Sequence, residues 1–150
     1  MHSSQGEGDF VLSISIDSLD SLGLVRAGLM IRETLEPISR QVFLNFGSSK
    51  KIGFLTRDIT DNSNKEVIKS YNFDRGELLL RKFGSTLTGF ARATLKEDWA
   101  FIASKEISFD SFYVGVAVST QPLLGRCGGG DINDGVCNVE SGGKCCSQVR

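Results

Sequence analysis

Cysteine is absent from the first 126 residues of this 150-residue chain, which also holds only one histidine, one tryptophan and two prolines. The single histidine, His2, lies next to the N-terminus, so a Ser/His or Cys/His nucleophilic relay is not expected. No apolar run approaches the roughly 20 residues that span a bilayer. The first residues, MHSSQGEGDF, lack the basic and apolar regions of a signal peptide.

An excess of charge of one sign is also missing. The 17 Lys and Arg residues nearly balance the 18 Asp and Glu residues, which leaves a net charge of −1. Nucleic acids and anionic membranes attract proteins with a concentrated positive field, so neither is an expected partner. A chain of this length buries about 70% of the surface that its unfolded form exposes. One domain with a small appendage is therefore expected.

Alternating apolar and polar residues predict short strands along most of the chain. The stretch FVLSISID at 10–17 repeats with a period of two, which places its apolar residues on one face of a strand. A strand over 27–32, a turn around Pro37 and a strand over 41–47 follow. In all, about nine short strands with polar turns and no convincing helix predict an all-β fold, an antiparallel β-sandwich over residues 1–122.

Residues 123–150 differ in composition, being rich in glycine and free of aromatic residues, and they carry all four cysteines, at 127, 137, 145 and 146. Structural zinc sites favour closely spaced C-x(2–4)-C pairs, which this spacing does not match. Adjacent cysteines bridge each other only with strain. Two interpretations of these cysteines remain open: a disulfide module, or the edge of a longer protein. Disulfides are typical of oxidising compartments, so an extracellular location is expected.

The body of the chain resembles a known family of sandwich domains. The runs GEGDFVLSISID, AGLMIRE, FARATLKEDWAFIASKEISF and FYVGVAVST occur in this order over about residues 6–121. They are similar to the concanavalin A-like jelly-roll family labelled "regulation of enolase"-like. The resemblance implies a jelly roll. It also implies further strands before and after this region, which are not evident here, so an unpaired sheet edge is expected.

The tail resembles the first half of a hevein-type chitin-binding module, through CGGGDINDGVC followed by CCSQ. That resemblance implies a Cys127–Cys146 disulfide, with the partners of Cys137 and Cys145 lying in a part that is missing. It also implies that Ser147 contacts chitin. The aromatic residues that complete such a site do not occur in this tail.

The carboxylates are candidate catalytic groups, because concanavalin A-like sandwiches also host retaining glucanases. Those enzymes carry an E-x-D-x-x-E strand motif, which is absent. Glu33 and Glu36 fall on opposite faces of a strand, whereas Glu106 and Asp110 lie about 13 Å apart along one. A retaining pair needs a separation of about 5 Å. The chain is therefore not expected to be an enzyme.

Calcium is the candidate metal ion, since many lectin sandwiches bind calcium through carboxylates in their loops. The candidate ligands are Asp17 with Asp20, and the group Asp58, Asp61, Asn62 and Asn64. Asp and Asn are also the residues that turns need. No metal and no cofactor is predicted.

Sugar binding relies on aromatic faces with a few polar groups. Most aromatic residues fall at core-facing or hairpin-packing positions, namely Phe10, Phe46, Phe54, Phe112 and Trp99. Residues of the opposite parity would line the outer or concave face of a sheet and form a candidate groove. These are Arg32, Phe43, Asn45, Phe90 and Arg92.

The sequence thus predicts a non-catalytic, extracellular carbohydrate-binding module whose ligand is a glycan or cell-wall polysaccharide, with chitin as one candidate. Two alternatives stay open. The first is a structural β-sandwich that binds a protein partner, and the second is an accessory fragment of a larger glycoside hydrolase.

Overall fold

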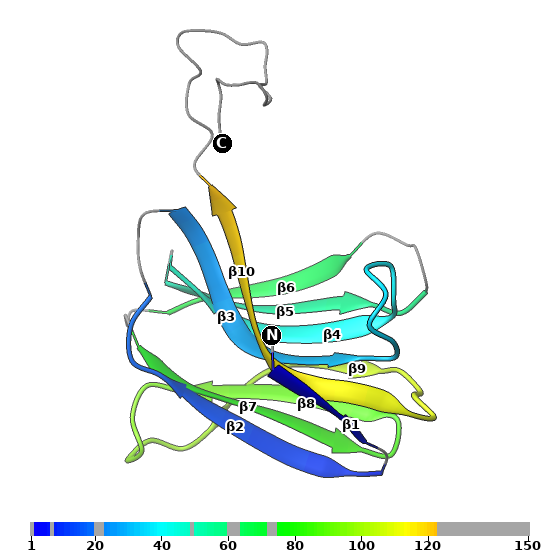
Figure 1. The fold of residues 1–150 in the computed structure, drawn as a ribbon. Helices are drawn as coiled ribbons and strands as arrows, with labels where there is room; N and C mark the ends of the chain where they lie inside the picture. Colours follow the sequence, from blue (N-terminus) through cyan, green and yellow to red (C-terminus); the bar gives the residue numbers. More distant parts are fainter. Residues whose placement is uncertain are drawn as a thin grey trace, which may run out of the picture. The chain divides into compact units, whose positions relative to one another are not determined.

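The computed structural model describes residues 2–6, 8–19, 23–48, 50–59, 64–71 and 75–122. Within these residues there are ten strands and no helix (Figure 1). No helix that could cross a membrane occurs in this part of the chain. The strands are β1 (His2–Gly6), β2 (Phe10–Ile16), β3 (Gly23–Arg32), β4 (Gln41–Gly47), β5 (Lys51–Arg57), β6 (Lys65–Ser70), β7 (Gly76–Phe83), β8 (Thr86–Arg92), β9 (Ala100–Glu106) and β10 (Phe112–Pro122).

The strands form two antiparallel sheets that pack face to face (Figure 1). The six-stranded sheet has the order β1-β10-β3-β4-β5-β6, and the four-stranded sheet has the order β2-β7-β8-β9. Hairpins connect β3 through β6 and β7 through β9, while the chain changes sheets after β1, β2, β6 and β9. The antiparallel all-β sandwich predicted from the sequence is confirmed.

The core lies between the sheets, and alternate residues of strands such as β4 and β7 point into it. Leu44 of β4 and Phe54 of β5 are at most 2% exposed and face Leu80 and Leu87 of the other sheet. A Cβ atom at Gly89 of β8 would lie 2.9 Å from side-chain carbons of both Leu44 and Phe54. The absence of a side chain at Gly89 therefore lets the two sheets approach each other at this point.

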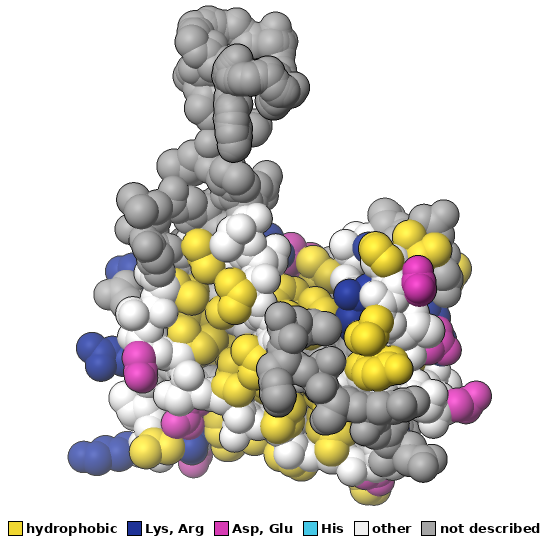
Figure 2. Space-filling view, viewed as in Figure 1, with side chains coloured by type: hydrophobic (Ala, Val, Ile, Leu, Met, Phe, Trp, Pro, Cys, Tyr) yellow, Lys and Arg dark blue, Asp and Glu magenta, His cyan; other side chains and the backbone are white. Residues whose placement is uncertain are grey.

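The six-stranded sheet is wider than the sheet it packs on, so its outer strands extend past the core. On β6, Val67 pairs with the buried Phe54 but is 47% exposed, and on β10 Val116 and Val118 are 39% and 64% exposed. Apolar side chains gather over β3 and β10 in the space-filling view (Figure 2). At the opposite edge, Lys69 of β6 donates to the carbonyl of Phe101 on β9.

The first strand adds one to the roughly nine strands predicted from the sequence and moves this edge of the sheet from β10 to β1. Residues 2–6 pair antiparallel with β10, from His2 opposite Val116 to Gly6 opposite Phe112. This pairing covers the backbone groups of β10 that an exposed edge would offer to another chain. The sequence HSSQG has no apolar alternation, so its strand follows from the partner that β10 provides and not from its own pattern.

The aromatic residues expected in the core are mostly found there. Phe46, Phe54 and Phe112 are each 2% exposed, and Phe10 packs against the same cluster. Trp99 lies outside the core cluster, where it stacks on a guanidinium. The residues assigned to the tail, which are Cys127, Cys137, Cys145, Cys146 and Ser147, lie outside the described part of the chain.

Candidate functional site

The sheet formed by β3 to β6 carries side chains that are buried although they point away from the core. Gln41, Phe43 and Asn45 of β4 are 8%, 4% and 2% exposed. They alternate with Val42, Leu44 and Phe46, which face the other sheet. We call the surface on which they lie the outer face. It is formed by Arg26, Gly28, Met30, Arg32, Gln41, Phe43, Asn45, Gly47, Lys51, Gly53, Leu55, Arg57, Glu66, Ile68 and Ser70.

Asn45 sits between two glycines in the middle of this face. Its neighbours across the sheet are Gly28 on β3 and Gly53 on β5. A Cβ atom at Gly53 would lie 3.1 Å from both the nitrogen and the oxygen of the Asn45 amide. The amide nitrogen donates to the carbonyl of Phe43 at 3.2 Å. The absence of a side chain at Gly53 leaves a narrow space beside a planar amide that can both donate and accept hydrogen bonds. Gly28 instead allows close approach of the backbone of Leu44.

An ion pair spans the face above Asn45. Arg26 Nη1 of β3 donates to Glu66 Oε2 of β6 at 2.6 Å, so the pair crosses both intervening strands. The same Oε2 atom would lie 2.5 Å from a Cβ atom at Gly53. The Arg26 and Glu66 side chains are 39% and 20% exposed. A guanidinium and a carboxylate thus sit over the Asn45 amide, where both remain accessible to a ligand.

Two further arginines occupy the end of the face next to the β3–β4 loop. Arg32 donates from Nη2 to the carbonyl of Glu36, and Arg57 donates from Nη1 to the carbonyls of Pro37 and Ser39 at 2.7 and 3.4 Å. Burial lowers the pKa of Arg32, and the nearby charge of Arg57 lowers this pKa further. The Nε atoms of both arginines are buried without a hydrogen-bond partner. An unmade hydrogen bond of this kind costs about 1–3 kcal/mol.

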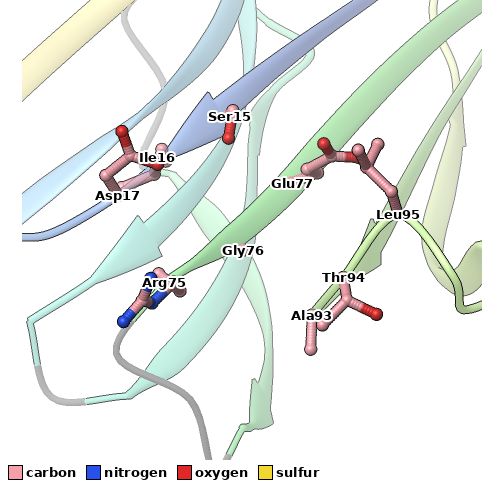
Figure 3. Close-up of a pocket in the computed structure, with 9 residues that line it drawn as sticks. All are labelled: Ser15, Ile16, Asp17, Arg75, Gly76, Glu77, Ala93, Thr94 and Leu95. Atoms are coloured by element: carbon pink, nitrogen blue, oxygen red, sulfur yellow. The ribbon is translucent and has the colours of Figure 1, made fainter.

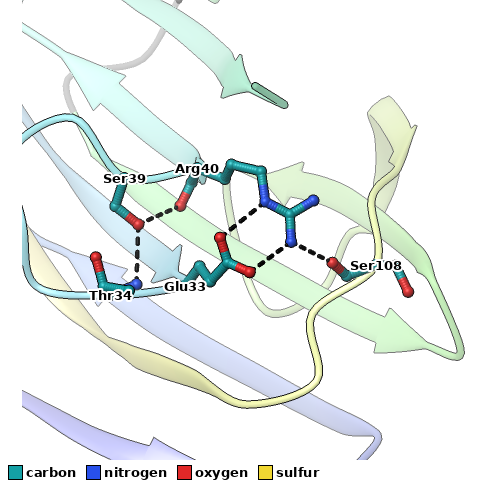
Figure 4. Close-up of polar contacts among 5 residues, drawn as sticks. All are labelled: Glu33, Thr34, Ser39, Arg40 and Ser108. Atoms are coloured by element: carbon teal, nitrogen blue, oxygen red, sulfur yellow. Dashed lines mark hydrogen bonds and ion pairs between the residues drawn. The ribbon is translucent and has the colours of Figure 1, made fainter. Parts of the chain in front are cut away.

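The loop that receives these arginines is held in place from its other side (Figure 4). Arg40 donates to both carboxylate oxygens of Glu33 at 2.9 and 2.7 Å and to the carbonyl of Ser108 at 2.7 Å. Its guanidinium also lies 5.2 Å from the centre of the Phe109 ring. The Arg40 hydrogen bond lowers the pKa of the Glu33 carboxyl group. These contacts tie the β3–β4 loop to the segment between β9 and β10.

The other two predicted site residues lie on the outer surface of the four-stranded sheet. Arg92 Nε donates to Glu77 at 2.7 Å, and its guanidinium stacks 4.1 Å from the centre of the Trp99 ring. Phe90 packs against Phe101 at 6.3 Å. The structure therefore brings Arg32, Phe43 and Asn45 onto one face and places Phe90 and Arg92 on the other.

A shallow cavity of about 190 Å³ lies near Arg92, where β2 ends, β7 begins and the chain leaves β8 (Figure 3). Ser15, Asp17, Arg75, Glu77 and Thr94 supply its polar lining. Glu77 is already engaged by Arg92, so the cavity shares one carboxylate with the Arg92–Trp99 stack.

Three of the carboxylates weighed in the sequence are held by partners in the structure. Glu33 pairs with Arg40, and Glu106 accepts hydrogen bonds from Ser85 and Thr86 at 2.9 and 2.5 Å. Asp58, a calcium candidate, lies 2.6 Å from the ammonium of Lys105. No group of three metal-binding side chains occurs among the described residues. Asp20, Asp61 and Asn62 lie outside them.

Four of the outer-face residues to which the structure gives a role were not predicted from the sequence, namely Gln41, Arg26, Arg57 and Glu66. Gln41 shares the parity of Phe43 and Asn45 on one strand, a signal that could have identified it. Arg26, Arg57 and Glu66 come from other strands, and only the pairing registers bring them to the same face.

Comparison with known proteins shows which solved structures share the fold of this chain but assigns the chain to no family. No protein-family model and no curated protein matches the chain. A functionally unknown protein from Saccharomyces cerevisiae matches with a TM-score of 0.60 and 14% identity over 80% of this chain. The chain spans 64% of the length of that protein.

The carbohydrate-binding module CBM66 from Bacillus subtilis matches with a TM-score of 0.51 and 13% identity, over 79% of this chain and 74% of the module. A prokaryotic β-1,3-1,4-glucanase from a mouse hindgut metagenome has a TM-score of 0.49 and 11% identity, over 76% of this chain and 56% of the enzyme. At these identities, the matches to the yeast protein and to the module establish a shared β-sandwich fold.

Proposed function

We propose that this chain is a non-catalytic glycan-binding domain that uses the outer face of its six-stranded sheet. The observation that carries the proposal is the burial of two amide side chains, Gln41 and Asn45, on a surface that points away from the core. Sites for small polar ligands combine an apolar floor with a few fixed polar groups. Here Phe43 supplies the floor, while the Arg26–Glu66 pair, which lies over the Asn45 amide, supplies donors and acceptors for sugar hydroxyl groups.

The shared fold with CBM66 supports the choice of ligand class, because that neighbour is named as a carbohydrate-binding module. A glycan ligand also fits an extracellular location, which the cysteine-rich tail favours. Chitin is one candidate polymer, through the resemblance of the tail to hevein.

The carboxylates support a binding role over a catalytic one. A glycosidase needs one carboxylic acid with a raised pKa. The shifts resolved for described carboxyl groups are all downward: Arg40 lowers the pKa of Glu33, Lys105 that of Asp58, and the Thr86 and Ser85 hydroxyl groups that of Glu106. Incubation with soluble glucans should therefore release no reducing ends, and steady release would contradict the non-catalytic assignment.

The proposal is tested by retention of the oxidised full-length protein on chitin, cellulose and β-glucan beads. We expect Asn45→Ala to weaken retention about tenfold, which corresponds to the loss of about 1.4 kcal/mol of hydrogen bonding. Phe90→Ala, on the opposite surface, should bind as the wild type does. A version that ends at Gln121 separates the sandwich from the tail. Equal loss for Asn45→Ala and Phe90→Ala would argue against the outer face.

A protein partner is the second candidate function, and the exposed apolar residues of β10 favour it. Val116 and Val118 lie where the six-stranded sheet extends past the core. Exposed apolar patches often mark protein interfaces. A stoichiometric protein complex that Val118→Ser abolishes, without retention on any polysaccharide, would favour this function over glycan binding.

A further inference from the structure

Arg32 and Arg57 occupy neighbouring positions at one end of the outer face. Gln41 of β4 pairs with Arg32 on β3 and with Arg57 on β5. Adjacent strands lie about 4.8 Å apart, so the two Cα atoms are separated by about 10 Å. Both guanidiniums reach toward the same loop, where they donate to backbone carbonyls of residues 36, 37 and 39. Two like charges are thus held close together in a partly desolvated place.

Neither charge has an anionic partner in the part of the chain that the structure describes. The Arg40, Arg92 and Lys105 side chains each pair with a carboxylate. Among the residues that the structure describes, the hydrogen bonds of Arg32 and Arg57 go to carbonyl oxygens alone. The Nε atoms of both are buried without an acceptor. Buried donors without partners are rare in proteins, so these two atoms set Arg32 and Arg57 apart from the paired arginines. A nearby anion would offset the repulsion between the two guanidiniums.

The charge of the whole outer face agrees with this observation. Its residues include four cations, Arg26, Arg32, Lys51 and Arg57, but one carboxylate, Glu66, which Arg26 already engages. The complete chain has a net charge of −1. Positive charge is therefore concentrated on the surface proposed to bind the ligand, in a protein that is otherwise balanced.

We infer that Arg32 and Arg57 form an anion subsite of the outer face, which binds carboxylate or sulfate groups of an acidic polysaccharide. This inference rests on the proposed function and names its ligand class. The planar guanidinium presents parallel N–H donors that match a carboxylate or sulfate. The loop carbonyls hold both guanidiniums in position before the ligand arrives, which lowers the ordering cost of binding. Gln41, between them, adds an uncharged amide for a neighbouring hydroxyl group.

The test compares polymers that differ only in charge, using the full-length protein at constant ionic strength. Polygalacturonate is paired with its methyl ester, and dextran sulfate is paired with dextran. We expect at least one acidic polymer to bind about tenfold or more tightly than its neutral partner. The pair that shows the difference identifies carboxylate or sulfate as the preferred group. Equal binding within both pairs overturns the subsite but leaves glycan binding standing, whereas no binding to any polymer overturns both proposals.

Three variants then show whether Arg57 is responsible for the preference for acidic polymers. Arg57→Gln should abolish the difference in affinity between acidic and neutral polymers. Arg57→Lys should reduce this difference, since an ammonium keeps the charge but lacks the paired N–H donors of a guanidinium. Lys96→Gln, an exposed change of equal charge in the loop after β8, should keep the full difference. An equal loss in Lys96→Gln would show diffuse attraction and overturn the subsite. If Arg57→Gln does not fold, the comparison of Arg57→Lys with wild type decides in the same way.

Discussion

The guanidinium of Arg26 and the carboxylate of Glu66 meet at 2.6 Å although the strands β4 and β5 lie between them. Both side chains stay partly exposed, at 39% and 20%, and pairs of this kind contribute about 0–1 kcal/mol to stability. Glu66→Gln should therefore change the free energy of unfolding in urea by less than about 1 kcal/mol while weakening glycan retention. A large loss of stability without a change in retention would show that the pair serves the fold alone.

The two glycines beside Asn45 should respond differently to an added methyl group. At Gly28 the new Cβ would lie 1.9 Å from the backbone oxygen of Leu44, so a strand must shift. At Gly53 it would meet the Glu66 and Asn45 side chains, which can move. Gly28→Ala should cost about 3 kcal/mol or more in urea unfolding, and Gly53→Ala about 1 kcal/mol. Gly53→Ala should nevertheless reduce glycan retention, because it fills the space around the Asn45 amide.

The Glu33–Arg40 pair predicts a pH-dependent contribution to stability. The Arg40 hydrogen bond holds the pKa of Glu33 below its ordinary value of 4.5. The folded state therefore binds this proton less readily than the unfolded state does. The stabilisation is complete above pH 4.5 and is lost as the pH falls through the lowered pKa. The difference in urea midpoint between wild type and Glu33→Gln should shrink on acidification. A difference that stays constant with pH would mean that the charge of Glu33 plays no part.

The single tryptophan reports which surface binds the ligand. Trp99 stacks on Arg92 beside the four-stranded sheet, opposite the outer face. Saturating glycan should leave its fluorescence maximum unchanged, while retention assays show binding. Arg92→Ala serves as the positive control, because loss of the stacked guanidinium changes the surroundings of the indole. A ligand-induced shift in the wild type would place binding near Phe90 and Arg92 instead.

Much of the fold could be predicted because burial on one face of a strand leaves an alternating pattern, as in β2 and β10. The first strand could not be predicted, since its residues are polar and pairing with β10 alone orders them. Arg32, Phe43 and Asn45 were placed together because one hairpin around Pro37 fixes their parity. Phe90 and Arg92 were placed with them because sheet membership depends on crossovers, which leave no periodic signal in the sequence.

The pairing of β1 with β10 also has a consequence for the order in which the protein folds. The hairpins from β3 to β6 and from β7 to β9 join neighbours in sequence, whereas β1 joins residue 2 to residue 116. Closing so long a loop has a large entropic cost, and contacts between distant residues slow folding. On the ribosome, β1 must wait for the synthesis of β10 before it finds its partner. Until then its backbone donors and acceptors are available to chaperones or to a neighbouring nascent chain.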